Sequence, residues 1–69
     1  MLFGDAGSDT IIAGDGDDEA LGGAGDDSIF GNLGDDTLNG GVGNDILAGG
    51  EGNDFAVAGE GNDLSLIHI

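Results

Sequence analysis

The stretch Gly40-Gly41-Val42-Gly43-Asn44-Asp45-Ile46-Leu47-Ala48 contains the pattern that decides the fold. It reads glycine, glycine, any residue, glycine, a polar residue and aspartate, followed by three residues with an aliphatic side chain in the middle. The same nine-residue pattern occurs seven times end to end, in repeats that begin at residues 4, 13, 22, 31, 40, 49 and 58. A short, fixed period of this kind is typical of a solenoid.

Two positions of the repeat do not vary among the seven copies. The fourth position is always glycine and the sixth is always aspartate. We call the sixth-position residues the column aspartates; they are Asp9, Asp18, Asp27, Asp36, Asp45, Asp54 and Asp63. This internal repetition is visible within the single sequence.

The last three residues of each repeat, such as Ser28-Ile29-Phe30, alternate outward, inward and outward, which predicts a short strand. The first six residues hold up to three glycines, which predicts a turn that passes through positive φ at those glycines. Two repeats, or 18 residues, then close one flattened coil. The predicted inward residues are Leu2, Ala20, Leu38 and Ala56 in one sheet and Ile11, Ile29, Leu47 and Ser65 in the other. The fold class expected from this pattern is all-β: a solenoid with two short-stranded sheets and 18 residues per coil.

The charge of the chain is one-sided. It has 15 acidic residues, no Lys or Arg and a formal net charge of -15. A chain without cations repels nucleic acid and anionic membrane surfaces, so we expect neither as a partner. The chain has no cysteine, which excludes a disulfide or a thiolate site. Two interpretations fit this composition: a disordered acidic tract, or a fold whose counter-charges are metal ions.

Stacked coils place the column aspartates close together. Neighbouring strands lie about 4.8 Å apart, so Asp9, Asp27, Asp45 and Asp63 are expected along one edge and Asp18, Asp36 and Asp54 along the other. Carboxylates about 5 Å apart repel each other by roughly 1–3 kcal/mol. Calcium favours such sites because it accepts carboxylate and carbonyl oxygens in irregular geometry, whereas magnesium requires a strict octahedron. Zinc and copper would require His or Cys, which the repeats lack.

The repeats, most clearly residues 22–30 and 40–48, resemble the calcium-binding nonapeptide of the repeats-in-toxin (RTX) family. The resemblance covers residues 4–63 and implies a parallel β-roll, that is, a right-handed β-solenoid, with calcium between loops on the same edge. It implies that the column aspartates and main-chain carbonyls of the loop glycines are the ligands. The candidate carbonyls belong to Gly7, Gly14, Gly16, Gly23, Gly25, Gly34, Gly41, Gly43, Gly50, Gly52, Gly59 and Gly61. Seven loops give five neighbouring pairs on the same edge, hence about five Ca²⁺ sites.

The resemblance also carries expectations about the whole protein. Members of the family are typically secreted by a type I system and fold when they meet extracellular calcium. We therefore expect a secreted or cell-surface location, with neighbouring domains of a larger toxin, protease, lipase or adhesin as partners. We predict no enzymatic activity for this chain, because it offers no nucleophile–base pair.

Two alternatives remain open from the sequence. An ice-binding or adhesive array on the same scaffold would need a regular ladder of Thr or Asn. The third repeat position offers none, since it reads Ala6, Asp15, Ala24, Leu33, Val42, Glu51 and Glu60. An acidic disordered spacer would fit the charge and the glycine content but not the constant repeat phase.

The remaining positions carry weaker signals. The acidic residues outside the sixth position, such as Asp17, Asp26 and Asp35, are predicted to be solvated surface. The fifth-position asparagines, such as Asn44, are predicted to shape their own turns by local hydrogen bonds. Residues 64–69 break the pattern and resemble a translated transposase adapter from a sequencing library. We therefore place the repeat domain at residues 1–63 and a non-native tail at 64–69, in which His68 has no function.

Overall fold

A computed structural model describes residues 1–66 of the chain, and these residues form eight strands. The strands are β1 (Leu2–Phe3), β2 (Thr10–Ile12), β3 (Glu19–Leu21), β4 (Ser28–Phe30), β5 (Thr37–Asn39), β6 (Ile46–Ala48), β7 (Phe55–Val57) and β8 (Leu64–Leu66). Within the part that the structure describes there is no helix, and so none that could span a membrane. Each predicted strand triplet is therefore a strand, and each predicted turn is a loop.

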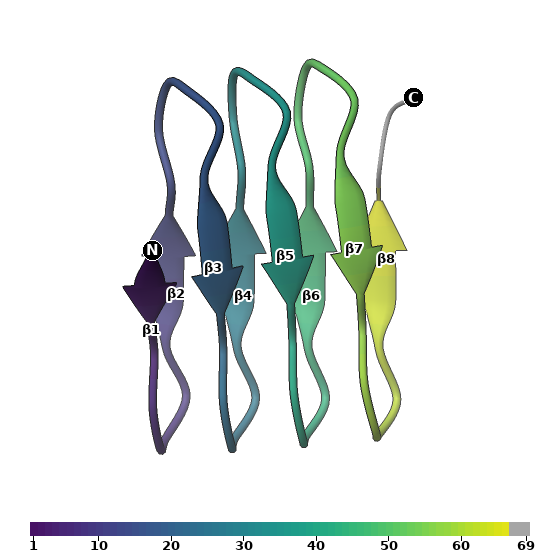
Figure 1. Ribbon diagram of the computed structural model, residues 1–69. Helices are drawn as coiled ribbons and strands as arrows, with labels where there is room; N and C mark the ends of the chain where they lie inside the picture. Colours follow the sequence, from purple (N-terminus) through teal and green to yellow (C-terminus); the bar gives the residue numbers. More distant parts are fainter. Residues whose placement is uncertain (67–69) are drawn as a thin grey trace.

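The strands form two parallel sheets, in the orders β1-β3-β5-β7 and β2-β4-β6-β8. Every pairing joins residues that are 18 apart, for example Ala20 with Leu38 and Ile29 with Leu47. In Figure 1 the chain descends through the front sheet, passes to the rear sheet, ascends and returns one step further along the axis. This path is a right-handed solenoid, and its coil of two strands and 18 residues agrees with the repeat length.

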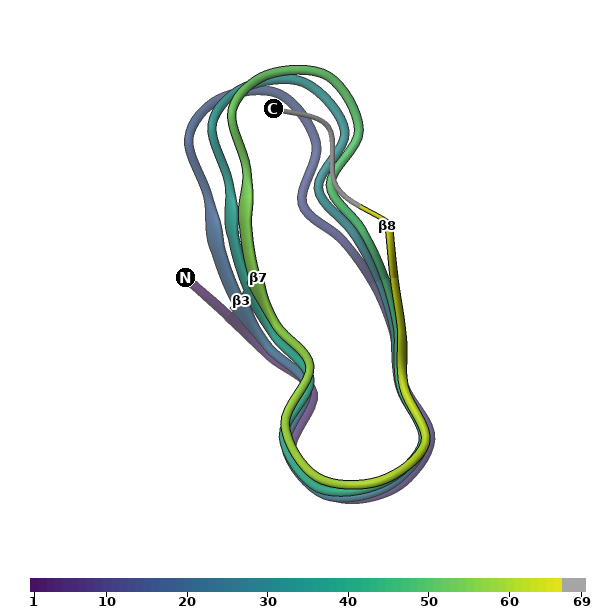
Figure 2. The same ribbon diagram turned by 90° about the vertical axis from the view of Figure 1, so that its right-hand side faces the viewer.

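The loops between the strands lie at two edges of the flattened coil (Figure 2). The loops of residues 4–9, 22–27, 40–45 and 58–63 follow β1, β3, β5 and β7, and they form what we call the four-loop edge. The loops of residues 13–18, 31–36 and 49–54 follow β2, β4 and β6 and form the three-loop edge. Viewed along the axis, successive loops of one edge lie over one another, so equivalent repeat positions form columns.

The core is a single layer of side chains between the two sheets. It consists of Ile11, Ala20, Ile29, Leu38 and Leu47, of which all but Ile11 have no exposed surface. The two predicted inward columns are thus confirmed in the middle of the roll. The outermost members pack less well, because β1, β7 and β8 lie at the ends of their sheets. Leu2 and Ala56 are half-buried there, and Ser65 is exposed.

The prediction that all three loop glycines require positive φ is wrong for the first of them. Positive φ occurs at the second position, as at Gly23 (88°), and at the fourth, as at Gly25 (106°), but not at first-position glycines such as Gly22. Two non-glycine residues adopt the same conformation at the second position: Asp5 at 71° and Asn32 at 69°. Asp and Asn are the residues best able to tolerate that region, which explains how they replace glycine there.

The strand pattern continues through Leu64–Leu66. This segment is β8, and it pairs with β6 in the register of the preceding repeats, although all three of its side chains are exposed. The pairing says nothing about the origin of these residues, so the domain boundary after Asp63 remains a prediction. His68 lies outside the described residues.

Candidate metal centre

Each column aspartate occupies the last loop position before a strand, because the repeat places it one residue before the outward–inward–outward triplet. Asp27, Asp36 and Asp45 are only 1% exposed, although each lies in a loop. Asp54 is 6% exposed, and the column aspartates of the outer loops are half-buried. The fold therefore buries acidic side chains in the middle of each edge, as completely as it buries the aliphatic core.

One carboxylate oxygen of each pair joins neighbouring coils. The backbone N–H of Asp9 donates to Oδ1 of Asp27 at 2.9 Å, and that of Asp27 donates to Oδ1 of Asp45 at 2.9 Å. The same bond recurs from Asp45 to Asp63, from Asp18 to Asp36 and from Asp36 to Asp54, at 2.7–2.9 Å. These five bonds join the five neighbouring pairs that the repeat phase predicts. The structure thus stacks the column aspartates along both edges.

The second carboxylate oxygen has no hydrogen-bond partner in the described part of the chain. This holds for the buried Oδ2 atoms of Asp9, Asp18, Asp27, Asp36, Asp45 and Asp54. An unpaired buried carboxylate oxygen is costly, and native folds satisfy such atoms with hydrogen bonds or ions. Because the chain has no Lys or Arg, no permanently charged basic side chain of its own is available for this role. The orphaned oxygens are the clearest indication that a cation binds here.

The first-position glycine leaves space beside the orphaned oxygen. A Cβ atom on Gly22 would lie 2.7 Å from Oδ2 of Asp27 and 2.7 Å from the carbonyl oxygen of Gly40 in the next coil. A Cβ atom on Gly40 would likewise lie 2.6 Å from Oδ2 of Asp45 and 2.6 Å from the carbonyl oxygen of Ala58. The column carboxylate and a main-chain carbonyl therefore face one side-chain-free space. In two loops the first position is alanine, at Ala13 and Ala58.

Sequence reasoning missed these first-position carbonyls as candidate ligands. It singled out the second- and fourth-position glycines instead, and the structure separates these two groups only in part. Among the second-position candidates, the carbonyls of Gly23 and Gly41 already accept a backbone hydrogen bond from the next coil, as in Val42 N–H to Gly23 O at 3.0 Å, whereas those of Gly14, Gly50 and Gly59 accept none within residues 1–66. The carbonyls of Gly7, Gly16, Gly25, Gly34 and Gly43 accept no backbone hydrogen bond within residues 1–66. The signal that could have distinguished them is the contact between coils, which the sequence does not contain.

Carboxylates alone do not complete a site. Among residues 1–66 no group of three or more His, Cys, Asp or Glu side chains converges as a metal site would require. Any ion between the loops therefore takes much of its coordination from carbonyls and water. That donor set, carboxylate plus carbonyl oxygen, fits calcium and does not fit zinc or copper.

Burial changes the acidity of the central column aspartates. Burial raises the pKa of Asp36 and of Asp45 above the ordinary value of 3.8, and the backbone N–H donated from the previous coil partly lowers it. The neighbouring aspartates raise the pKa further through charge repulsion, from Asp54 and Asp18 on Asp36 and from Asp63 and Asp27 on Asp45. The metal-free fold therefore disfavours the charged form that a metal would require.

The fifth repeat position makes a second ladder between coils. Oδ1 of Asp26 accepts the backbone N–H of Asn44 at 2.8 Å, and Oδ1 of Asn44 accepts that of Asn62 at 2.8 Å. On the three-loop edge, Oδ1 of Asp17 accepts the N–H of Asp35. These side chains are exposed, as predicted for the acids. The prediction that Asn44 bonds within its own turn is wrong, because its recorded bonds all cross to another coil.

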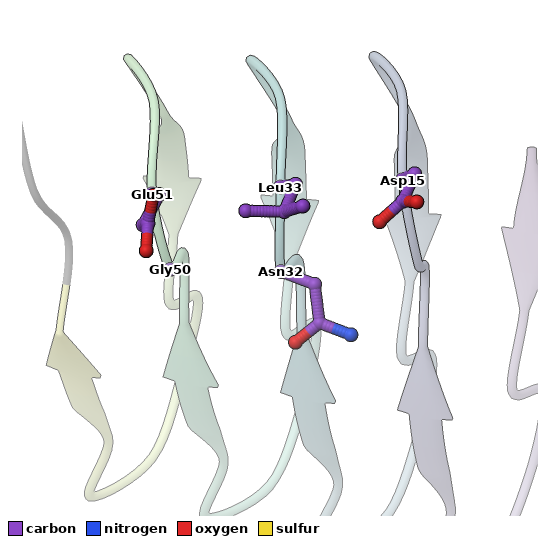
Figure 3. A pocket seen from close by; sticks show the side chains of 5 residues that line it. All are labelled: Asp15, Asn32, Leu33, Gly50 and Glu51. Atoms are coloured by element: carbon purple, nitrogen blue, oxygen red, sulfur yellow. The ribbon is translucent and has the colours of Figure 1, made fainter.

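A shallow cleft of about 400 Å³ lies on the three-loop edge (Figure 3). It is lined by Asp15, Asn32, Leu33, Gly50 and Glu51, with Leu33 between the two acidic side chains. Asp15 and Glu51 are exposed, as expected for surface acids. None of the column aspartates lines this cleft, so it is separate from the candidate metal centre.

Comparison with known families agrees with the geometry. A family model described as the RTX calcium-binding nonapeptide repeat, in four copies, matches residues 1–29, 14–47 and 30–64. The chain belongs to the RTX calcium-binding nonapeptide repeat family. The overlapping matches cover the chain from β1 to the first residue of β8. Neither the curated proteins nor the solved structures gave a match. Membership of the RTX family makes the chain a calcium-binding repeat module, and the buried column aspartates fit that role.

Proposed function

We propose that this chain is a structural module whose folding is driven by extracellular calcium. The observation that carries the proposal is the set of six buried Oδ2 atoms that have no hydrogen-bond partner within residues 1–66, in a chain without lysine or arginine. A cation between neighbouring loops neutralises these oxygens and removes the repulsion along each edge. Without it, the fold has to bury uncompensated carboxylates.

The ligands in this proposal come from two sources. The column aspartates supply the carboxylate oxygens, and the main-chain carbonyls that face the interloop spaces supply the rest. Fourth-position carbonyls, such as that of Gly25, and first-position carbonyls, such as that of Gly40, are better placed than those of Gly23 and Gly41, which already accept a backbone hydrogen bond. Five pairs of neighbouring loops correspond to about five ions. Five divalent ions would change the net charge from -15 to -5.

The small core supports the dependence on metal. Within residues 1–66 only five hydrophobic residues are buried, and one of them is Ala20. A chain of this size with so small a core usually needs a disulfide, a metal or a partner to fold. The chain has no cysteine and therefore no disulfide. Metal binding is then the source of additional stability that its own residues can provide. Binding free energy of the ions then becomes folding free energy.

The rest of the proposal concerns the parent protein. Family membership supports a chain that is exported unfolded by a type I system and orders at the cell surface or outside it. The module then holds the neighbouring domains of a toxin, protease, lipase or adhesin in a folded arrangement. We assign it no catalytic step, no contact with nucleic acid and no contact with a membrane.

Counting the bound ions tests the proposal. Native mass spectrometry of the chain in millimolar calcium should show a main species with about five calcium ions, whereas magnesium at the same concentration should give no defined stoichiometry. A protein that binds the two ions equally, or that carries a broad distribution of adducts centred near zero, would overturn the assignment of interloop calcium sites.

A further inference from the structure

We propose that the side-chain amide of Asn39, the residue before Gly40, is a site of spontaneous deamidation and that the folded roll protects it from this reaction. Asn39 is the last residue of β5, and it is the only asparagine of the chain that is followed by glycine. Glycine at this place has no Cβ to hinder its backbone nitrogen. Asparagine is among the chemically labile residues of proteins. This inference rests on the proposed function, because calcium controls whether the roll is folded.

The reaction needs the backbone nitrogen of Gly40 to reach the side chain of Asn39. The nitrogen attacks Cγ of Asn39, a C–N bond forms, and the bond from Cγ to Nδ2 breaks. Ammonia leaves with the proton lost from Gly40 N–H, and a five-membered succinimide remains. Water then opens the ring. Opening at Cγ gives aspartate, and opening at the main-chain carbonyl gives isoaspartate.

The fold holds both reacting groups in other contacts. The N–H of Gly40 donates to the carbonyl oxygen of Val57 in the neighbouring coil at 2.9 Å. Oδ1 of Asn39 accepts the N–H of Gly41 at 3.1 Å. Asn39 itself is half-buried, in register between Leu21 of β3 and Val57 of β7. Ring closure therefore requires the local opening of the contact between β5 and β7, and the unfolded chain has no such barrier.

The product matters because the fold depends on a constant repeat length. Isoaspartate carries the main chain through the side chain and adds a methylene group between β5 and the loop of residues 40–45. Beyond that point, Asp45 and the residues after it would be out of phase with the equivalent positions of the preceding coils. A chain modified at Asn39 should therefore form the roll incompletely. Time spent without calcium would reduce the fraction of chains that can still fold.

Peptide mapping by mass spectrometry tests this proposal. The full chain is incubated at neutral pH and 37 °C in calcium, in calcium-free buffer, and in urea, which gives the rate of the unfolded chain. Deamidation is then measured at Asn39 and, as internal references, at Asn32, Asn44, Asn53 and Asn62. Circular dichroism of the same samples reports whether each is folded. In the Asn39→Gln variant, the deamidated peptide that arises from Asn39 should be absent from the map, which identifies the signal of this site.

We expect Asn39 to be the fastest of the five sites in calcium-free buffer and in urea. We expect calcium to slow it by about tenfold or more, since an opening free energy of about 1.4 kcal/mol already reduces the open population by that factor. If calcium folds the chain but Asn39 deamidates as fast in calcium as in calcium-free buffer, the proposed protection is wrong. If Asn39 deamidates in urea no faster than the reference asparagines, the proposed site is wrong. If calcium does not change the circular dichroism, the proposed function is wrong, and protection by calcium is wrong with it. The comparison of Asn39 with the reference asparagines in urea still decides whether Asn39 is the labile site.

Discussion

At the scale of single residues, the two oxygens of each column aspartate have different roles. Oδ1 of Asp27 accepts a backbone hydrogen bond from the previous coil, whereas Oδ2 of the same residue is buried without a partner. The first role is structural and needs only an acceptor. The second role needs a positive charge from outside the chain. In the proposed function, a single side chain therefore joins the coils and also binds the metal ion.

Replacing Asp27 with asparagine separates these two roles. Asp27→Asn keeps an acceptor at Oδ1 but removes the charge at Oδ2, so we expect the calcium midpoint for folding to rise roughly tenfold, or about 1.4 kcal/mol. The matched control is Asp26→Asn, which removes the same charge from the adjacent exposed position. Asn44 already fills the equivalent position two repeats later and accepts the same type of hydrogen bond.

Titration of the two variants with calcium, followed by calorimetry or circular dichroism, shows whether Asp27 is a ligand or acts only through the net charge. The account requires Asp27→Asn to shift the midpoint much more than Asp26→Asn. Equal shifts would mean that the column aspartates act only through the net charge of the chain.

The column aspartates could be predicted from the sequence alone, because the invariance of the sixth position is visible within one chain. The different roles of the glycines could not. Gly22 and Gly25 look alike in the sequence, but Gly25 has φ of 106° while Gly22 is needed for the space beside Asp27. The hydrogen bonds of Asn44 to neighbouring coils could not be predicted either. Asparagine is favoured both by a local turn and by a contact 18 residues away, so its presence does not distinguish the two.

At the scale of strands and loops, register is determined by the alternation within each triplet. A slip of one residue would turn Ile29 outward and expose the core. Strand positions, pairing and the central core therefore followed from the sequence. The lower burial of Leu2 and Ser65 in the outer coils did not follow from the sequence. Alternation alone does not show that their strands, β1 and β8, have a neighbour on one side only.

The same substitution at an inward and at an outward isoleucine should have different effects on stability. Ile29 has no exposed surface, whereas Ile12 is 63% exposed. We expect Ile29→Val to lower the free energy of unfolding by about 0.5–1.5 kcal/mol, and Ile12→Val to change it by less than about 0.5 kcal/mol. Urea unfolding in saturating calcium measures both, and equal losses would contradict the assignment of the two faces.

At the scale of the whole molecule, the balance is between a small core and a charge of -15. Aliphatic burial is confined to one layer, while both edges bury carboxylates. The fold thus places its least compensated groups between coils, where an ion contacts two loops at once. Calcium binding and the stacking of coils are, on this account, the same process.

Acid should act in opposite directions with and without calcium. Burial raises the pKa of Asp36 and Asp45, so the metal-free fold binds more protons than the unfolded chain between 3.8 and the raised values. The stability of the metal-free fold then increases as pH falls through this window, and the gain is complete below 3.8. With calcium, protons compete with the ion for the same carboxylates, so acidification lowers the order.

Dichroism recorded from pH 7 down to about 4, close to the reference range of carboxyl groups, shows these opposite slopes. The metal-free sample should gain β-structure and the calcium-loaded sample should lose it. Parallel responses in the two samples would mean that the buried carboxylates are not the groups that bind calcium.

The most direct test of the central claim is far-UV circular dichroism of the chain during a calcium titration, with magnesium as the matched control. The account predicts a change from coil to β-structure with calcium, within the range of about 0.1–1 mM that is typical of extracellular calcium modules, and no change with magnesium. A chain that stays coil up to about 10 mM calcium, well above that range, or that responds equally to magnesium, would contradict a fold driven by calcium.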